Sequence, residues 1–118
     1  LDINAGRYDR ALELIDRYRR DYPEDDLSKE YLLSQAEISR FVKKPQQAWA
    51  YMADFRRRYP DDPRSQSSLK EQISEADELG LIDETLNFIN LYRAAYPDDP
   101  DSRLLLLSKM RKEWEAER

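Results

Sequence analysis

The residues best suited to chemistry are clusters of carboxylates that recur along the chain. They are Glu24-Asp25-Asp26, Asp61-Asp62, and Asp98-Asp99 with Asp101. Closely spaced carboxylates can bind a divalent cation, but these clusters lack the alternating oxygen ligands and the central glycine of a calcium loop. Negative side chains also stabilise the positive N-terminal end of a following helix. Because the clusters recur at a fixed spacing, we favour this helix-end role and expect no metal site.

Catalytic groups of the common kinds are missing from the sequence. There is no histidine and no cysteine, which excludes disulfides, thiolate nucleophiles, histidine-based triads and imidazole or thiolate zinc sites. Aspartate and glutamate are so abundant that a pair of them is no sign of glycoside hydrolysis, which needs two acids at a set separation across a pocket. The sequence therefore predicts no catalytic residues and no cofactor.

Basic and aromatic side chains offer a second kind of chemistry, the binding of a polymer. Arg19, Arg56 and Arg93 recur near expected helix ends and are suited to an anionic polymer. A cation in a last helical turn also opposes the negative helix end and can pair with the aspartate of the turn, and we favour this structural role. Aromatic residues at helical spacing usually belong to the core. The residues least fixed by the repeat, and so open to carbohydrate stacking, are Trp49, Tyr51 and Trp114.

Charge and hydropathy limit the partners. The 118 residues carry 20 Lys and Arg against 25 Asp and Glu, a formal net charge of -5. An acidic chain lacks the positive footprint that attracts nucleic acid. The longest aliphatic run, residues 104–107, is far shorter than the roughly 20 residues of a membrane-spanning helix. We therefore expect no nucleic-acid partner and no membrane-embedded segment.

An internal repeat of 37 residues positions all of these side chains. Tyr22-Pro23-Glu24-Asp25 recurs as Tyr59-Pro60-Asp61-Asp62 and as Tyr96-Pro97-Asp98-Asp99, and the alignment needs no gap. Apolar residues within each unit step by three and four, as in amphipathic helices, and each helix should end near its Tyr-Pro pair. The expected N-caps are Ser28, Ser65 and Ser102. The pattern predicts an all-α fold of about six helices at residues 7–22, 28–42, 45–59, 65–79, 82–96 and 102–117.

The repeat resembles the tetratricopeptide family, whose second helix runs Gly-x-Tyr-x-x-Ala, then an aliphatic or aromatic residue, a small or aromatic residue, and Pro. Here the matching positions are Gly6, Tyr8, Ala11, Ile15, Tyr18 and Pro23. They recur as Lys43, Pro45, Ala48, Met52, Phe55 and Pro60, and as Gly80, Ile82, Thr85, Ile89, Tyr92 and Pro97. The period of 37 residues exceeds the ~34 usual in the family. The resemblance implies a right-handed superhelical solenoid of antiparallel helix pairs.

The repeat frame suggests one segment of a longer array. Residues 1–25 form a partial repeat, 26–62 and 63–99 are full repeats, and 100–118 form a half repeat. Repeat units bury their apolar faces only against neighbours, so we expect the end helices to lack partners and to be able to stack on other copies. Several of the leucines at 104–107 are expected to pack against a further helix.

The resemblance also places a binding surface. First helices line the concave groove in the family, which suits selective contact with a peptide or protein. Carried over by position, the partner-binding residues are Glu30, Leu33, Glu37, Arg40, Ser67, Lys70, Ser74, Asp77, Leu104, Leu107, Arg111 and Trp114.

The Tyr-Pro-acidic repeat ending is similar to that of bacterial periplasmic tetratricopeptide proteins, in particular the periplasmic solenoid of outer-membrane exporters of biofilm exopolysaccharide. This resemblance implies a non-catalytic, periplasmic scaffold that holds a polysaccharide deacetylase or hydrolase near the export pore. Two alternatives stay open. One is direct guidance of the exported polysaccharide, and the other is a scaffold in envelope or outer-membrane assembly.

Overall fold

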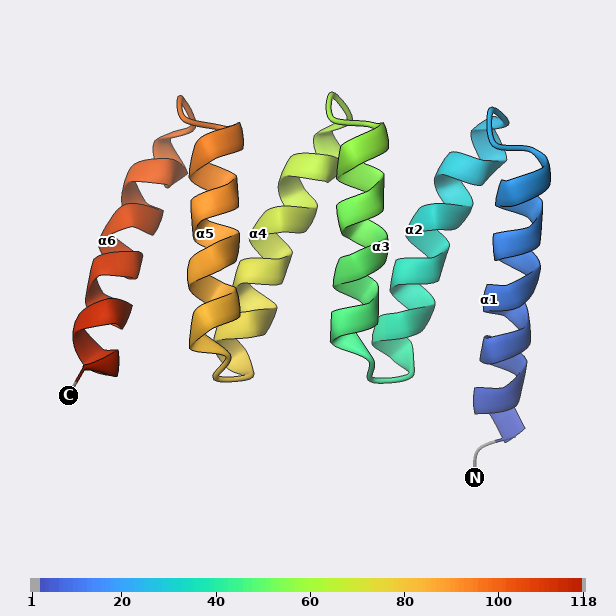
Figure 1. Cartoon of the computed structure of the whole chain (residues 1–118), viewed down its shortest axis with the longest axis horizontal. Helices are drawn as coiled ribbons and strands as arrows, with labels where there is room; N and C mark the ends of the chain where they lie inside the picture. The colour runs from blue at the N-terminus through green and yellow to red at the C-terminus, as the bar shows by residue number, and fades with distance from the viewer. Residues whose placement is uncertain (1–2, 118) are drawn as a thin grey trace. The chain divides into compact units, whose positions relative to one another are not determined.

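The computed structural model describes the backbone of residues 3–117 and the side chains of residues 6–117. This part of the chain forms six α-helices and no strand (Figure 1). The predicted all-α class and six helices are confirmed, and Gly6, expected before the first helix, lies inside it. The helices are α1 (Ile3–Asp21), α2 (Asp26–Phe41), α3 (Pro45–Arg58), α4 (Pro63–Glu78), α5 (Ile82–Ala95) and α6 (Pro100–Ala116).

The helices that follow the acidic turns begin at aspartate caps. Each cap has an extended backbone, and its side chain accepts a hydrogen bond of 2.8–2.9 Å from the backbone N–H two residues further on. Aspartate is as good an N-cap as serine, and its charge also suits the helix dipole. Pro63 and Pro100 occupy first-turn positions, where no N–H is needed. The three caps are Asp25, Asp62 and Asp99.

The prediction that Ser28, Ser65 and Ser102 are the N-caps is therefore wrong. All three serines are buried in the first turn of their helices. The hydroxyl of Ser28 donates to the backbone oxygen of Tyr22 at 2.6 Å, and that of Ser102 donates to the equivalent oxygen of Tyr96 at 2.7 Å. Ser28 and Ser102 therefore tie the start of one helix to the end of the helix before it.

Aromatic pairs mark the ends of α1, α3 and α5. Tyr59 and Tyr96 each donate a backbone N–H to the carbonyl four residues earlier at 2.8 Å, and the proline that follows stops the helix. The tyrosine ring packs on the aromatic ring four residues earlier in all three helices. The ring centroids lie 5.0 Å apart for Tyr18–Tyr22, 5.2 Å for Phe55–Tyr59 and 5.1 Å for Tyr92–Tyr96.

The turns after α2 and α4 close through residues with positive φ. Lys43 has a φ of 62° and Gly80 a φ of 72°. The N–H of the residue after each one bonds to a carbonyl in the last helical turn, that of Ser39 at 2.8 Å and that of Ala76 at 3.0 Å. This is the Schellman arrangement, in which glycine avoids the steric cost that a lysine carries.

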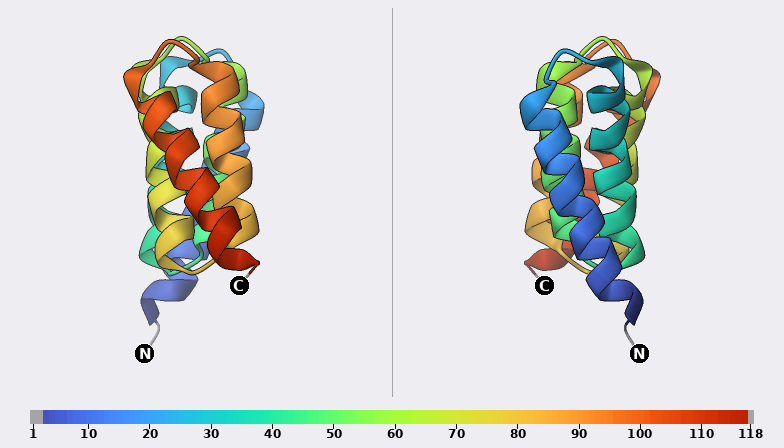
Figure 2. Two further views of the ribbon diagram at one scale, coloured as in Figure 1. Left: turned by 90° about the vertical axis from the view of Figure 1, so that its left-hand side faces the viewer. Right: turned by 90° about the vertical axis from the view of Figure 1, so that its right-hand side faces the viewer.

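The chain divides into two compact units, Leu1–Asp61 with α1, α2 and α3, and Asp62–Arg118 with α4, α5 and α6. Neighbouring helices within a unit run antiparallel (Figures 1 and 2). The helices of each expected full repeat lie together in one unit. The core of the first unit consists of Leu32, Ala36, Ala48, Met52 and Phe55. The core of the second consists of Leu69, Ile73, Ile89 and Tyr92.

Candidate functional site

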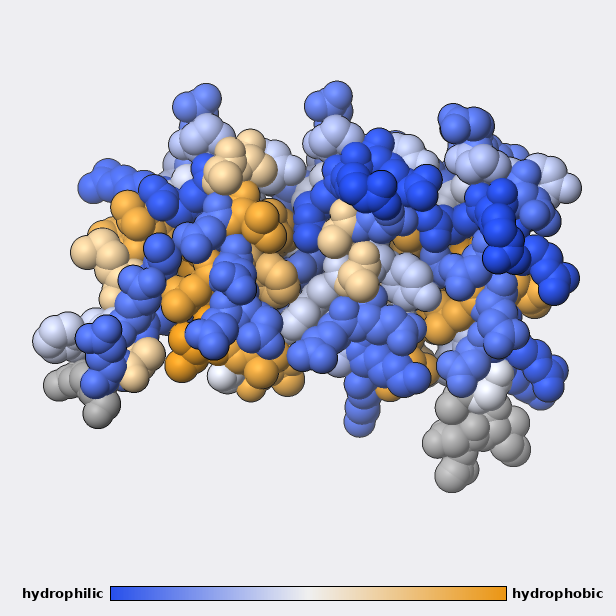
Figure 3. Space-filling model, viewed as in Figure 1, coloured by the Kyte–Doolittle hydropathy of each residue, from blue (hydrophilic) through white to orange (hydrophobic). Residues whose placement is uncertain are grey.

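The second unit contains a groove of about 230 Å³ between α4 and α6. Its apolar wall comes from Ile73, Leu104 and Leu105. On the face that Figure 3 presents, hydrophobic residues also gather over α5 and α6. Polar groups at the groove come from both helices, and such a mixture suits a partner side chain that is apolar but has polar neighbours. The polar lining residues are Lys70, Ser74 and Asp101.

Lys70 is held in place by two carboxylates and an aromatic ring. Its Nζ lies 2.5 Å from Oδ2 of Asp101 and 3.7 Å from Oδ2 of Asp99. The same ammonium group stands 5.5 Å from the ring centroid of Tyr92, a cation–π distance. The hydrogen bond to Asp101 raises the pKa of Lys70 well above its ordinary value. Lys70 therefore stays charged and fixed at the groove.

Behind Lys70, a hydrogen-bond network joins α4, α5 and the start of α6. The Nε2 of Gln66 donates to the Tyr92 hydroxyl at 2.8 Å and to Oδ2 of Asp99 at 2.6 Å, and Tyr92 donates to the same carboxylate oxygen. Burial, followed by the bond to Asp99, raises the pKa of Tyr92, while the Tyr92 hydrogen bond lowers the pKa of Asp99. These bonds fix the N-terminal end of α6 beside the groove.

A polar pocket of about 380 Å³ lies in the first unit. It is lined from all three helices of that unit and from the turn between α1 and α2. Arginines and aspartates dominate its lining, so its chemistry is that of ion pairs rather than apolar contact. The lining residues are Asp16, Arg19, Arg20, Pro23, Ser28, Asp54, Arg58 and Tyr59.

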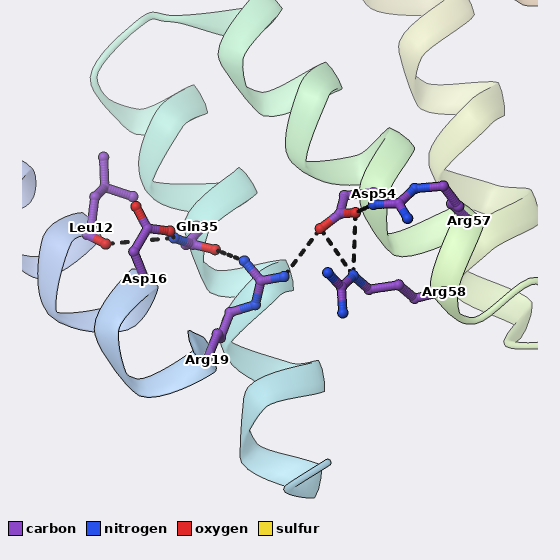
Figure 4. Close-up of polar contacts among 7 residues, drawn as sticks. All are labelled: Leu12, Asp16, Arg19, Gln35, Asp54, Arg57 and Arg58. Carbon is purple, nitrogen blue, oxygen red and sulfur yellow. Dashed lines mark hydrogen bonds and ion pairs between the residues drawn. The ribbon is translucent and has the colours of Figure 1, made fainter. Parts of the chain in front are cut away.

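Hydrogen bonds at this pocket join α1 both to α2 and to α3 (Figure 4). The buried Gln35 donates to Oδ1 of Asp16 at 2.6 Å and accepts from Nη1 of Arg19 at 2.9 Å. Arg19 then donates to Oδ2 of Asp54 at 3.1 Å, and Asp54 also binds Arg57 and Arg58.

The charged side chains of this hydrogen-bond network largely neutralise one another. Burial alone would raise the pKa of Asp54, but the hydrogen bonds from Arg58 and Arg19 and the charges of Arg58 and Arg57 lower it below its ordinary value. We had expected Arg19 to pair with the aspartate of the turn after α1, but it pairs with Asp54 of α3 instead. These hydrogen bonds and ion pairs hold the three helices of the first unit together.

The structure brings together part of the predicted partner-binding set. Lys70, Ser74 and Leu104 line the groove of the second unit. Asp77 receives a hydrogen bond from Lys112 of α6, which joins the far ends of the same two helices. The predicted residues that lie exposed on α4 and α6 outside the groove lining are Ser67, Leu107, Arg111 and Trp114.

The predicted residues on α2 belong to the first unit. Glu30 and Glu37 are exposed, while Arg40 is half-buried. Leu33 is also half-buried and packs against the core of its unit, so its main contacts are internal. These four residues line neither of the two pockets described above.

Sequence reasoning missed three residues of the groove, Ile73, Asp101 and Leu105. Asp101 was recognised as part of an acidic cluster, but none of the three was assigned to a binding surface. Ile73 lies three residues after Lys70, and Asp101 lies three residues before Leu104 and four before Leu105, which was the signal that places these residues on the same helix faces. Trp49 is buried, so it is not open to carbohydrate stacking, whereas Trp114 is exposed.

Comparisons of the chain with protein-family models, curated proteins and solved structures find no match. None of the helices that the structure describes is long and apolar enough to cross a membrane. Within the same residues, no group of three or more Asp or Glu side chains is arranged to hold a metal ion.

Proposed function

We propose that the chain is a non-catalytic scaffold that binds a segment of a protein partner in the groove between α4 and α6. One observation carries the proposal: three residues placed on the binding surface by family position, Lys70, Ser74 and Leu104, line the same groove. The groove also combines an apolar wall with fixed charges, as selective contact sites do.

The proposed binding mode follows from the groove lining. An apolar side chain of the partner packs against Ile73, Leu104 and Leu105, and its backbone or polar neighbours bond to Ser74 and Asp101. Because Lys70 is already held by Asp101 and Asp99, its side chain loses little conformational freedom on binding. Specificity then comes from the fit of one anchor side chain between two fixed helices.

The wider architecture is part of the proposal. The 37-residue repeat and the resemblance to tetratricopeptide repeats support a right-handed superhelical solenoid of antiparallel helix pairs. The recurring aspartate caps and tyrosine–aromatic pairs agree with such an array. The resemblance further supports a periplasmic setting in exopolysaccharide export, with a polysaccharide deacetylase or hydrolase as the partner.

Affinity capture from a bacterial envelope extract tests this function with three baits. These are the native chain, the groove variant Leu104→Glu and the control variant Leu91→Glu, which alters an exposed leucine of α5 outside the groove. We expect the native chain and the control to retain a polysaccharide-modifying enzyme that the groove variant loses. Calorimetry with the purified enzyme then measures the affinity directly.

Other outcomes of the capture separate the alternatives. If the native chain instead captures an envelope-assembly protein that the groove variant loses, that result would support a scaffold in outer-membrane assembly. Identical proteins on all three baits, or none on any, contradict binding through this groove. In either case circular dichroism of each bait shows whether the variant is folded.

Guidance of a polysaccharide is the second candidate, and the polar pocket of the first unit favours it. Arg20 and Arg58 line this pocket of about 380 Å³, large enough for one charged sugar unit. An anionic oligosaccharide that binds the native chain should bind Arg20→Ala more weakly and Leu104→Glu equally well. Equal binding of the native chain and both variants would exclude the pocket as the polymer site.

A further inference from the structure

We propose that α6 of one copy of this chain pairs head to tail with α1 of a second copy. The contacts are equivalent to those between α2 and α3, and between α4 and α5, within one chain. The two end helices carry the two complementary faces of a helix pair that the chain already forms twice. The proposal does not depend on the partner-binding groove, because Leu104 lies on a different side of α6 from the face described here.

The face on α6 is identified by comparing residues 37 apart. Leu69 and Ile73 of α4 are buried in the core that α4 forms with α5. The equivalent residues of α6 are Leu106, which is half-buried, and Met110, which is 57% exposed against 8% for Ile73. The left view of Figure 2 presents α6 toward the viewer. The surface that receives α5 on α4 is therefore open on α6.

The face on α1 is identified in the same way. Tyr51 of α3 and Phe88 of α5 pack against the cores of their units. The equivalent residue of α1 is Leu14, which is 61% exposed. Tyr18 is only half-buried, although its equivalents Phe55 and Tyr92 are fully buried. The surface that α3 packs against α2, and that α5 packs against α4, is thus open on α1. The right view of Figure 2 presents α1 toward the viewer.

Charge complementarity favours a second copy as the occupant. In the α2–α3 pair, the Gln47 side chain donates to the hydroxyl of Ser39 at 3.0 Å. The residue of α1 equivalent to Gln47 is Arg10, and the residue of α6 equivalent to Ser39 is Glu113. A pairing of α6 with α1 in the same geometry therefore sets opposite charges against each other, and both of these residues are exposed. Such a head-to-tail interface leaves one unpaired face of each kind at the two ends of an open assembly, and further copies add on there.

Sedimentation velocity over a wide concentration range tests the pairing with the whole chain. The native chain should associate progressively as its concentration rises. Met110→Glu and Leu14→Glu should each stay monomeric, because each places a charge on one of the two faces. The control Leu91→Glu should associate like the native chain, and circular dichroism should show the same helix content in all four proteins.

A mixture of the two monomeric variants gives the sharpest result. The Leu14→Glu copy keeps an intact α6 face and the Met110→Glu copy keeps an intact α1 face, so an equimolar mixture should form a dimer and nothing larger. Arg10→Glu and Glu113→Arg should each weaken native association several-fold at low salt, and the double variant should recover it. A native chain that is monomeric throughout, or a mixture that forms no dimer, overturns the proposal.

Discussion

The buried hydroxyl of Tyr92 donates a hydrogen bond to Asp99, the residue that caps α6. One carboxylate therefore serves two helices, because its other oxygen accepts the backbone N–H of Asp101. The same relationship recurs between Tyr18 and Asp25, where the hydroxyl lies 3.0 Å from Oδ2 and the aspartate caps α2. The tyrosine thus couples the end of one helix to the start of the next, seven residues on.

Replacing Tyr92 by phenylalanine should destabilise the chain by about 1.5 kcal/mol, because a buried hydrogen bond to a charged acceptor is lost while the ring is kept. Urea unfolding followed by circular dichroism measures the change. Tyr18→Phe is the matched control: its hydroxyl makes the same bond at a more exposed site and should matter less. A larger loss for Tyr18→Phe than for Tyr92→Phe would contradict this account.

Acid should destabilise the chain through Asp99 and Asp54. The hydrogen bond from Tyr92 lowers the pKa of Asp99, and the arginines around Asp54 lower its pKa in spite of burial. A carboxyl whose pKa is lower when folded contributes stability above its unfolded pKa of about 4, and this contribution is lost as the pH falls through the folded pKa. The urea midpoint should therefore fall steeply below about pH 4.

The variant Asp99→Asn isolates one part of this pH dependence. Asparagine still accepts hydrogen bonds but does not titrate in this range, so the variant should be less stable at neutral pH and should lose less stability on acidification. Unfolding curves at several pH values between 6 and 2.5 make the comparison. Parallel pH profiles for the native chain and the variant would show that Asp99 is not one of the groups responsible.

The helices could be predicted from sequence because their signals are local. The step of three and four residues, the Tyr-Pro stops and the 37-residue recurrence fix the helix order. The choice between Asp25 and Ser28 as cap was not fixed, because both residue types cap helices equally well. Only the structure of the turn shows that the Ser28 hydroxyl donates to the carbonyl of Tyr22, and that the Asp25 carboxylate accepts the N–H of the first helical turn.

The polar contacts between helices were less accessible to sequence reasoning. Gln35 stands where leucine is common in the resembled family, which marks the position as unusual but does not name a partner. Its partners Asp16 and Arg19 lie 19 and 16 residues away on another helix, and their approach depends on the packing of α1 against α2. Groove residues such as Leu105 have the same limitation, because a groove requires two helices at a known spacing.

The bonds of Arg19 to Gln35 and Asp54 can be tested against its neighbour in the sequence. Arg19→Ala should cost about 1–2 kcal/mol, because it leaves the buried Gln35 and the partly buried Asp54 with fewer hydrogen bonds. Arg20→Ala changes an exposed residue of the same type in the same helical turn and should stay within about 0.5 kcal/mol of the native chain. Equal effects of the two substitutions would exclude a structural role for the Arg19 contacts.

The two turns with positive φ should respond in opposite directions to substitution. Gly80→Ala should destabilise the chain by about 1 kcal/mol, because a Cβ raises the energy of this backbone conformation although no atom lies within 4 Å of it. Lys43→Gly should stabilise the chain by roughly 0.5–1 kcal/mol, because it removes the same strain, less the extra freedom glycine brings to the unfolded chain. Thermal and urea unfolding of the two variants measure both effects. If both substitutions changed the free energy of unfolding in the same direction, backbone strain at these two turns would not account for the stability of the variants.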